Sequence, residues 1–308
     1  MIAETKFSKI VALWKEDKKQ YVKRSTFAAY TLLIENHILP SFGEMALVEE
    51  QDVQTFVFRK LNEGLSHKTI KDILIVLKMI LRFGAKNQMT EYRQIDIKFP
   101  TERDKHSIDI LNRSHQKQIM EYIRLHFTFK NLGIYICLSA GMRIGEICAL
   151  TWDDLDVENG IIHVRKTIQR IYVIEEHRKY TEVILDTPKT KNSIREIPMT
   201  KNLLKMIRPI KKIVNGNFYV LTNEPKPTEP RTYRNYYKQF MQSLSLPLMK
   251  FHGLRHSFAT RCIESKCDYK TVSVLLGHSN ISTTLNLYVH PNLEQKKRCI
   301  ERMQNALK

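Results

Sequence analysis

The sequence predicts a mainly α-helical protein with a small β-sheet, an α+β fold arranged as two domains. Its length of 308 residues is typical of two domains. Apolar residues recur at helical spacing through the first hundred positions, whereas short alternating or continuous apolar runs gather between residues 161 and 198. A polar, basic stretch broken by Pro100 separates the two parts.

Four apolar stripes in the first part are predicted as helices, at about residues 7–21, 25–40, 53–61 and 66–81. Ser25 and Ser66 are predicted N-caps, because a serine hydroxyl can accept a hydrogen bond from an unpaired N–H of the first turn. The second helix is expected to stop near Pro40, and the third to end at Gly64. Together these elements predict a compact four-helix domain over residues 1–98.

A linker at 99–107 leads to a second domain at 108–291, which is followed by a tail at 292–308. In this domain a helical pattern runs from Ser114 to about Leu150. Strands are expected at 161–164, 171–174, 182–185 and, as a shorter one, 194–198. After Thr200 the pattern is helical again, apart from a Pro-rich loop at 224–230.

The charge of the chain points to a polyanionic partner. Lys and Arg total 50 against 32 Asp and Glu, a formal net charge of +18. Residues 1–100 carry a net +4 and residues 101–308 a net +14, so the second part supplies most of the positive field. Such an excess opposes compaction unless a polyanion balances it, although a merely basic soluble protein is the alternative.

Several classes of protein are excluded by what the sequence lacks. Five cysteines without a C-x-x-C pair argue against a disulfide framework and a zinc ribbon, and suit a reducing cytosol. The N-terminus has no apolar signal-peptide core, and no apolar run approaches a membrane span, so a cytoplasmic protein without a membrane partner is expected. No glycine-rich phosphate loop is present, and no nucleotide cofactor is expected.

Four separated clusters contain residues suited to chemistry. They surround Arg143 in AGMRIGE, Lys189 in TPKT, His252 and Arg255 in HGLRH, and His278 in LGHS, which Tyr288 follows ten residues later. Each cluster alone has an ordinary interpretation, such as a surface arginine, a solvated turn lysine or a core tyrosine.

Metal chemistry is not expected at these clusters. His252 and His256 are spaced like the two histidines of a zinc helix, but the Glu of H-E-x-x-H and a third ligand are missing. The acidic run at 153–156 suggests a magnesium site, yet a two-metal nuclease needs ligands from several segments, and carboxylates before a strand usually serve turns.

Taken together and in this order, the four clusters resemble the tyrosine recombinase (phage integrase) family. The phrases that carry the resemblance are AGMRIGEICALTWDDLD, TPKTKNSIREIPM, HGLRHSFAT and LGHSNISTTLNLYVH, within residues 108–293. The resemblance implies that the first domain is the helical core-binding, SAM-like DNA-binding domain and the second is the catalytic domain. It implies a metal- and ATP-independent DNA strand transferase that forms a 3′-phosphotyrosyl intermediate, with no cofactor.

The anion-binding and nucleophilic roles fit the chemistry of the residue types. Arg143 and Arg255 are expected to clamp the phosphate oxygens, which gain negative charge during attack. Tyr288 is the expected nucleophile. A phenol attacks only after it loses its proton, and the ordinary pKa of tyrosine is about 10, so at neutral pH the proton is still present. Two arginines and a histidine nearby would favour its loss. His278 is expected to donate a hydrogen bond to a phosphate oxygen.

The remaining roles concern protons and support. Lys189, on a turn, is the expected acid for the departing 5′ oxygen, and His252 is expected to take or share the tyrosine proton. Glu146, three residues after Arg143, is expected to support the arginine or a histidine; the alternative is an exposed helix glutamate. His256 is expected to be structural rather than catalytic.

The resemblance also implies the partners. They are double-stranded DNA with short inverted-repeat core sites and a homo-tetramer on that DNA; an accessory DNA-bending or directionality protein is left open. The tail has an apolar stripe at Leu293, Ile300, Met303 and Leu307, which is expected to dock on a neighbouring protomer or on its own domain. The protein is expected to be bacterial or phage-encoded and nucleoid-associated.

Two alternatives remain open at this point. A type IB topoisomerase would share the chemistry but relax supercoils without exchanging strands, and a DNA-binding regulator could keep the fold without catalysis. Among recombinases, integrase, invertase and resolvase roles all stay open, and integration or excision of a mobile element is the preferred prediction.

Overall fold

The structure is a computed structural model that describes residues 5–91, 94–101, 109–175, 178–188, 191–288, 293–305 and 307. The chain divides into two units, and the mainly helical α+β class is confirmed. Unit 1 comprises Met1–Lys105 and Ile171–Glu182, and unit 2 comprises His106–Arg170 and Val183–Lys308. The hairpin segment Ile171–Glu182 groups with unit 1, whereas the sequence placed it in the second domain.

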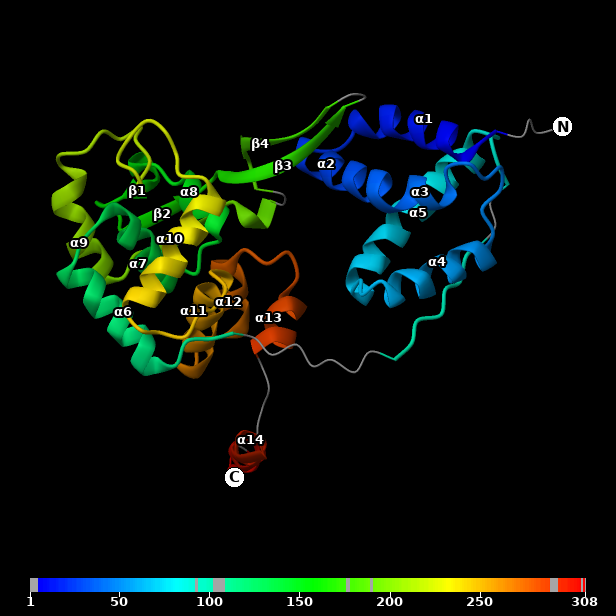
Figure 1. The fold of residues 1–308 in the computed structure, drawn as a ribbon. Coiled ribbons are helices and arrows are strands. Elements are labelled where there is room, and N and C mark those ends of the chain that lie inside the picture. The colour runs from blue at the N-terminus through cyan, green and yellow to red at the C-terminus, as the bar shows by residue number, and fades with distance from the viewer. Residues whose placement is uncertain are drawn as a thin grey trace. The chain divides into compact units, whose positions relative to one another are not determined.

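Unit 1 is built from helices around one apolar core (Figure 1). Its elements are α1 (Phe7–Lys19), α2 (Arg24–Leu33), the π-helix η1 (Ile34–Ile38), α3 (Leu39–Phe42), α4 (Glu50–Asn62) and α5 (His67–Lys86). The fully buried side chains of this core include Phe7, Ile10, Ile34, Phe56 and Ile73. The predicted apolar stripes therefore do form the core of the unit.

The second predicted helix differs from the structure at both ends. It begins after Lys23, so Ser25 lies inside α2, and its buried Oγ has no hydrogen-bond partner among the described residues. At its other end the helical segment continues through η1 and α3 to Phe42, two residues after Pro40, near which it was expected to stop. The π-helix η1 ends two residues before Pro40, whose ring and missing N–H interrupt regular helical hydrogen bonding.

Ser25 and Ser66 should respond in opposite ways to replacement by alanine. Ser66 is the N-cap of α5, as predicted, and its Oγ accepts from the Thr69 N–H at 3.2 Å. We expect Ser66→Ala to lower the free energy of unfolding by about 1 kcal/mol. Ser25→Ala should raise it by about 0.5–1 kcal/mol, because alanine favours the helix and buries no unpaired hydroxyl. Urea unfolding of both variants measures this, and a destabilised Ser25→Ala protein would show that the hydroxyl is used.

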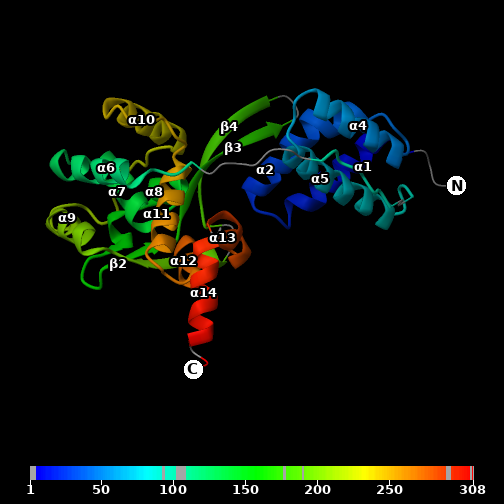
Figure 2. The same ribbon diagram turned by 90° about the horizontal axis from the view of Figure 1, so that it is seen from below.

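Unit 2 packs its helices around a small sheet (Figure 1; Figure 2). Its helices are α6 (Arg113–Leu125), α7 (Phe129–Ala140), α8 (Ile144–Ala149), α9 (Lys201–Lys211), α10 (Pro230–Ser243), α11 (His252–Glu264), α12 (Tyr269–Leu276), α13 (Ile281–Tyr288) and α14 (Leu293–Asn305). The single helical run predicted from Ser114 to Leu150 is thus three helices. Thr128 caps α7, and Gly141 ends it in a left-handed conformation.

The strands form two antiparallel arrangements. β1 (Leu155–Asp156), β2 (Ile161–Val164) and β5 (Arg195–Pro198) make a three-stranded sheet in the order β1-β2-β5. β3 (Thr167–Glu175) and β4 (Arg178–Asp186) pair as a two-stranded ribbon. The four predicted strands correspond to β2, β3, β4 and β5. Two 3-10 turns, η2 (Trp152–Asp154) and η3 (Lys191–Ser193), complete the described elements of this unit.

Burial alternates along β5 and positions a charged residue inside. Arg195 and Ile197 are buried, whereas the intervening Glu196 is exposed. Because alternate residues of a strand point to opposite faces, Arg195 shares the inward face with the apolar Ile197. The sheet thereby presents one arginine to the interior of unit 2.

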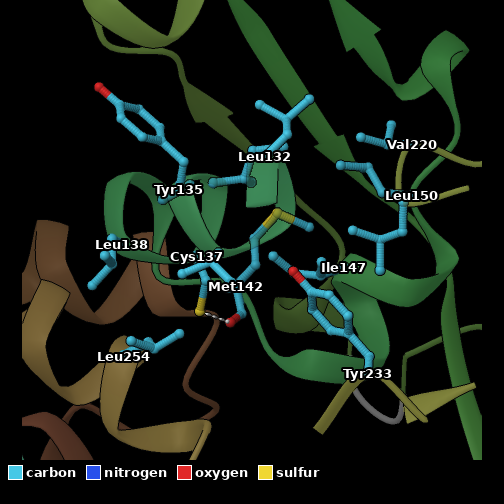
Figure 3. Packing of buried hydrophobic residues seen from close by; sticks show 14 of the residues in the cluster. Leu132, Tyr135, Cys137, Leu138, Met142, Ile147, Leu150, Val220, Tyr233 and Leu254 are labelled. Atoms are coloured by element: carbon cyan, nitrogen blue, oxygen red, sulfur yellow. Dashed lines mark hydrogen bonds between the residues drawn. The ribbon is translucent and has the colours of Figure 1, made fainter. Parts of the chain in front are cut away.

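Helix α7 lies at the centre of the unit 2 core. Nearly all of its residues are buried, and Figure 3 shows Leu132, Tyr135 and Leu138 of α7 together with Leu254 of α11 and Tyr233 of α10. Such a helix needs apolar residues all round, which explains why no one-sided stripe is visible in its sequence. This packing fixes the position of the C-terminal end of α7, which borders the site described below.

Candidate active site

The predicted site residues lie on neighbouring elements of unit 2, apart from Lys189, which falls outside the described residues. Arg143 is the N-cap of α8, His252 and Arg255 begin α11, His278 follows α12, and Tyr288 ends α13. Both views place α11, α12 and α13 side by side (Figure 1; Figure 2), and residues of the three helices contact one another.

Two glycines in left-handed conformations shape the backbone of the site. Gly141 ends α7 with φ of 63°, and Gly277 ends α12 with φ of 65°. A Cβ on Gly141 would lie 2.4 Å from a ring carbon of Phe258, and one on Gly277 would lie 3.1 Å from the Arg195 guanidinium. Glycine is therefore needed at both turns for conformation and for space.

Arg255 is held between these two turns. Its side chain is buried, and its Nη1 donates to the Gly141 carbonyl at 2.8 Å while its Nη2 donates to the Leu276 carbonyl at 2.6 Å. Burial lowers the pKa of Arg255, and the nearby Arg143 lowers it further, while Glu146 raises it. Two backbone carbonyls thus fix the plane of the guanidinium before any ligand is present.

Glu146 is a buried carboxylate shared by two arginines. It accepts from the backbone N–H and Nη1 of Arg143, both at 2.8 Å, and from Nη1 and Nη2 of Arg195 at 3.1 and 3.0 Å. Burial alone would raise its pKa, but Arg195 and Arg143 outweigh burial and lower it. The alternative of an exposed helix glutamate is wrong, because the side chain is 2% exposed.

Arg143 and Arg195 also bind the backbone near α12. Arg143 Nη2 donates to the Gly277 carbonyl at 3.0 Å, and Arg195 Nε donates to the Leu275 carbonyl at 2.7 Å. The Arg143 side chain stays 34% exposed, whereas Arg195 is almost fully covered. Arg143 can therefore reach a ligand, while Arg195 holds Glu146 in place.

His278 is partly buried and contacts α13. Its Nδ1 lies 2.8 Å from Oγ1 of Thr284, a residue with no exposed surface. Desolvation and the surrounding Arg255 and Arg143 lower the pKa of His278 to about 4, so the ring is neutral at pH 7.

Tyr288 is hydrogen-bonded to His256. Its Oη lies 2.5 Å from His256 Nδ1, and the His252 ring meets the His256 ring edge-on, with centroids 4.6 Å apart. Among the described contacts, none joins His252 to Tyr288. The expectation that His256 serves structure alone therefore overlooked its contact with the tyrosine hydroxyl.

The pKa values around Tyr288 describe a neutral cluster. Burial raises the pKa of Tyr288 to about 12, although Arg255 acts in the opposite direction. Desolvation, with His256 and Arg255, lowers the pKa of His252 to about 4, and desolvation and Arg255 also lower the pKa of His256. Burial therefore opposes the expected ease of proton loss from Tyr288, whereas Arg255 favours it.

An open pocket of about 400 Å³ lies beside the arginines. It is lined by Arg143, Glu146, Pro188, Gly277, His278 and Thr283, among others. Arg143 contributes a positive charge to this pocket, and the negative charge of Glu146 is already paired. The pocket therefore suits an anion. Among the described residues no three His, Cys, Asp or Glu side chains are grouped to hold a metal ion. No helix in the described ranges is long and apolar enough to cross a membrane.

The sequence placed Arg195 beyond the Lys189 cluster without predicting a role for it, and it gave no sign of Thr284 or of the contact of His256. Strand alternation in REIP could have flagged Arg195, since it predicts that Arg195 shares a face with the apolar Ile197. Thr284 and His256 carry no local signal, because each depends on contacts between separate helices.

Comparison with known proteins identifies the family of the chain. The sequence pattern of the phage integrase family matches residues 109–295, and that of the phage integrase N-terminal SAM-like domain matches residues 6–60. A tyrosine recombinase XerC-like protein of Caldanaerobacter subterraneus subsp. tengcongensis is 31% identical over 309 residues, covering 92% of this chain and 78% of the relative. The ICEBs1 integrase of Bacillus subtilis is 23% identical, covering 89% and 76%.

The fold is shared with a solved integrase structure. The Tn1549 transposon integrase in complex with transposon right end DNA superimposes with a TM-score of 0.78 at 23% identity, over 97% of this chain and all of that one. The match of the family pattern to more than half of the chain, together with the 31% identical relative, establishes the family. The chain belongs to the phage integrase family of tyrosine recombinases, enzymes that cleave and rejoin DNA strands through a tyrosine.

Proposed function

We propose that this enzyme is a site-specific recombinase whose nucleophile is Tyr288, and that it integrates or excises a mobile element. The observation that carries the proposal is the Tyr288 hydroxyl on α13, next to α11, which carries the buried Arg255 and its coordinated guanidinium. Relatives named as the ICEBs1 integrase and as the transposase of transposon Tn916 support the mobile-element role.

In the proposed reaction, Arg143 and Arg255 bind the non-bridging oxygens of a DNA phosphodiester. Arg143 is partly exposed toward the pocket, and Arg255 keeps N–H groups beyond the two that its carbonyl partners occupy. Glu146 and Arg195 hold Arg143 in position. Attack by Tyr288 breaks the bond to the 5′ oxygen and leaves a 3′-phosphotyrosyl bond, whose energy is kept for rejoining.

The proton donors follow from the same arrangement. A neutral His278 that accepts from Thr284 at Nδ1 carries its proton on Nε2, which is then available to a phosphate oxygen. Lys189 follows Pro188 of the pocket in the chain and remains the proposed acid for the 5′ oxygen. His252 is proposed to support the transfer of the tyrosine proton through its ring contact with His256.

Covalent trapping tests the function. Incubating the protein with fragmented DNA of its source, denaturing and sequencing the protein-linked strands should give one short inverted repeat for the wild type. Tyr288→Phe should give no adduct, because phenylalanine lacks the attacking oxygen, yet should keep DNA binding in a gel-shift assay.

Other outcomes would contradict the proposal in different ways. Adducts scattered without sequence preference would indicate a topoisomerase. An adduct that persists in Tyr288→Phe would move the nucleophile to another residue. Sequence-specific binding without any adduct from the wild type would favour a DNA-binding regulator.

We also propose a tetramer on DNA, in which the tail docks on a neighbouring protomer. In α14 and just after it, Ile300, Met303 and Leu307 are 61%, 55% and 80% exposed, so their apolar surface is available. A lambda integrase structure is a tetramer bound to a Holliday junction.

Deleting residues 292–308 should abolish the tetramer on the trapped DNA site while the monomer still folds. The expected cause is loss of the exposed apolar stripe, and the matched variant Ile300→Ser with Met303→Ser should behave alike. Analytical ultracentrifugation with DNA measures assembly, and thermal unfolding measures the fold. Loss of folding in either variant would mean that the tail packs on its own domain.

A further inference from the structure

The closest polar neighbour of the Tyr288 hydroxyl among the described residues is His256, at 2.5 Å from Oη to Nδ1. The ring centroids are 5.6 Å apart and the ring planes are inclined by 54°. His256 lies on α11, one residue after Arg255, and Tyr288 is the last residue of α13. The two helices contact each other within unit 2, so their packing sets this geometry.

Both partners are held by their surroundings. The Tyr288 ring packs against the apolar cluster of Ala259, Val272 and Leu276, which leaves its hydroxyl as the polar end that meets α11. His256 is braced by the edge-on ring of His252. The packing of α11, α12 and α13 therefore holds the two side chains in contact.

The role proposed below takes the Tyr288 hydroxyl as the donor and His256 Nδ1 as the acceptor of this hydrogen bond. A phenol has one proton to give, and with a pKa of about 12 Tyr288 is neutral at pH 7. Among the described residues only His256 offers it an acceptor. The imidazole then accepts at Nδ1 and carries its own proton on Nε2, which requires a neutral ring.

The titratable groups that face His256 come from three segments. They are Arg255 and His252 on its own helix, Asp109 before α6, and Tyr288 at the end of α13. Burial and Arg255 lower the pKa of His256, while Asp109 acts against them. A bound phosphodiester adds negative charge beside Arg255, which would make a protonated His256 less costly.

We propose that His256 is a further catalytic residue, whose Nδ1 takes the proton of Tyr288 as Oη attacks the phosphorus. The inference rests on the proposed role of Tyr288. The O–P bond to tyrosine forms and the bond from phosphorus to the 5′ oxygen breaks; the tyrosine proton moves to Nδ1, and a separate acid protonates the 5′ oxygen. In rejoining, the 5′ hydroxyl attacks the phosphorus and gives its proton back to that acid, the bond from phosphorus to the tyrosine oxygen breaks, and His256 returns its proton to Tyr288. His252 acts on this step through its contact with the His256 ring.

The decisive variant is His256→Asn, because an amide oxygen can accept the hydrogen bond near the position of Nδ1 but cannot take the proton. The substrate is a duplex copied from the trapped site, with sulfur in place of the scissile 5′ oxygen. A thiolate leaves without an acid, so the single-turnover rate reports the nucleophile alone. We expect cleavage of this duplex to slow by roughly 10²–10⁴-fold.

The pH profile separates proton transfer from a structural effect. The wild-type rate should be nearly level above pH 6.5, where His256 is neutral. In His256→Asn the phenolate must form by loss of its proton to solvent, so the rate should rise about tenfold per pH unit toward the tyrosine pKa. A variant that is slow but has the wild-type profile would overturn the inference, as would a wild-type rate.

Two further measurements guard against a folding defect and misassignment. Added imidazole should restore cleavage to His256→Ala, and restoration should fail if the residue only fills space. His252→Asn should slow the same duplex less than His256→Asn, and the reverse order would assign the proton to His252. If the wild type itself forms no Tyr288-dependent adduct, the proposed function fails and this inference fails with it.

Discussion

Replacing Arg255 by alanine should remove strand cleavage and also destabilise unit 2. The guanidinium satisfies the carbonyls of Gly141 and Leu276 inside the protein, so alanine leaves both without their donor and opens a cavity. We expect the free energy of unfolding to fall by about 2–5 kcal/mol. Cleavage should slow by roughly 10³-fold or more, because an arginine on the transferring phosphate is lost.

The variant Arg255→Lys distinguishes charge from geometry. Lysine keeps the positive charge but presents a single ammonium instead of a planar fork, so it cannot hold both carbonyls and a phosphate oxygen in the same way. Single-turnover cleavage should remain far below wild type, while urea unfolding should give a stability between those of wild type and Arg255→Ala. Cleavage by Arg255→Lys at the wild-type rate would show that a point charge is sufficient.

Glu146→Gln should be the most damaging substitution that preserves side-chain shape. It leaves the buried Arg195 without its carboxylate and releases Arg143 from the same partner. Removing one partner of a buried ion pair typically costs roughly 3–5 kcal/mol. Cleavage should fall as well, since Arg143 loses the contact that orients it toward the phosphate.

The pH dependence of this effect has a defined sign. The folded protein holds the pKa of Glu146 below its ordinary value of 4.5, so the stability from its charge is complete above that value and is lost as the pH falls through the folded pKa. Urea unfolding at several pH values should therefore show the difference between wild type and Glu146→Gln shrinking in acid. A difference independent of pH would contradict the assignment of a charged Glu146.

Glu264→Gln is the matched control. Glu264 also pairs with two arginines, Arg113 and Arg261, but its side chain is 36% exposed. Solvent screening makes such a pair worth about 1 kcal/mol or less. The contrast between the two glutamates isolates the effect of burial.

Local sequence patterns predicted the helices and strands of this fold better than the boundaries between them. The cap at Ser66 and the strands β2 and β5 follow from residues within a few positions of one another. The buried position of Ser25 depends on how α2 packs, which no local pattern contains. The helical pattern before Leu150 was not divided into its three helices, because α7 is buried on nearly all sides and its ends are marked by single residues, Thr128 and Gly141.

The same distinction applies to the site. Arg143 and Glu146 are three residues apart in one capping turn, so their pairing is visible in the sequence. Arg195 reaches Glu146 across 49 positions, and His256 reaches Tyr288 across 32. Such pairs arise only when separate helices and strands pack together. Lys189 lies outside the described residues, and its role stays a prediction.

The single carboxylate shared by two arginines has a consequence for electrostatic balance. At neutral pH the described part of the site holds the charges of Arg143, Arg195 and Arg255 against that of Glu146, while His252, His278 and Tyr288 are uncharged. The surplus is two positive charges. A phosphodiester carries one negative charge at rest and approaches two when a fifth oxygen joins the phosphorus. The described residues of the site therefore match the charge of the five-coordinate state more closely than that of intact DNA, which is the condition for faster reaction rather than merely tighter binding.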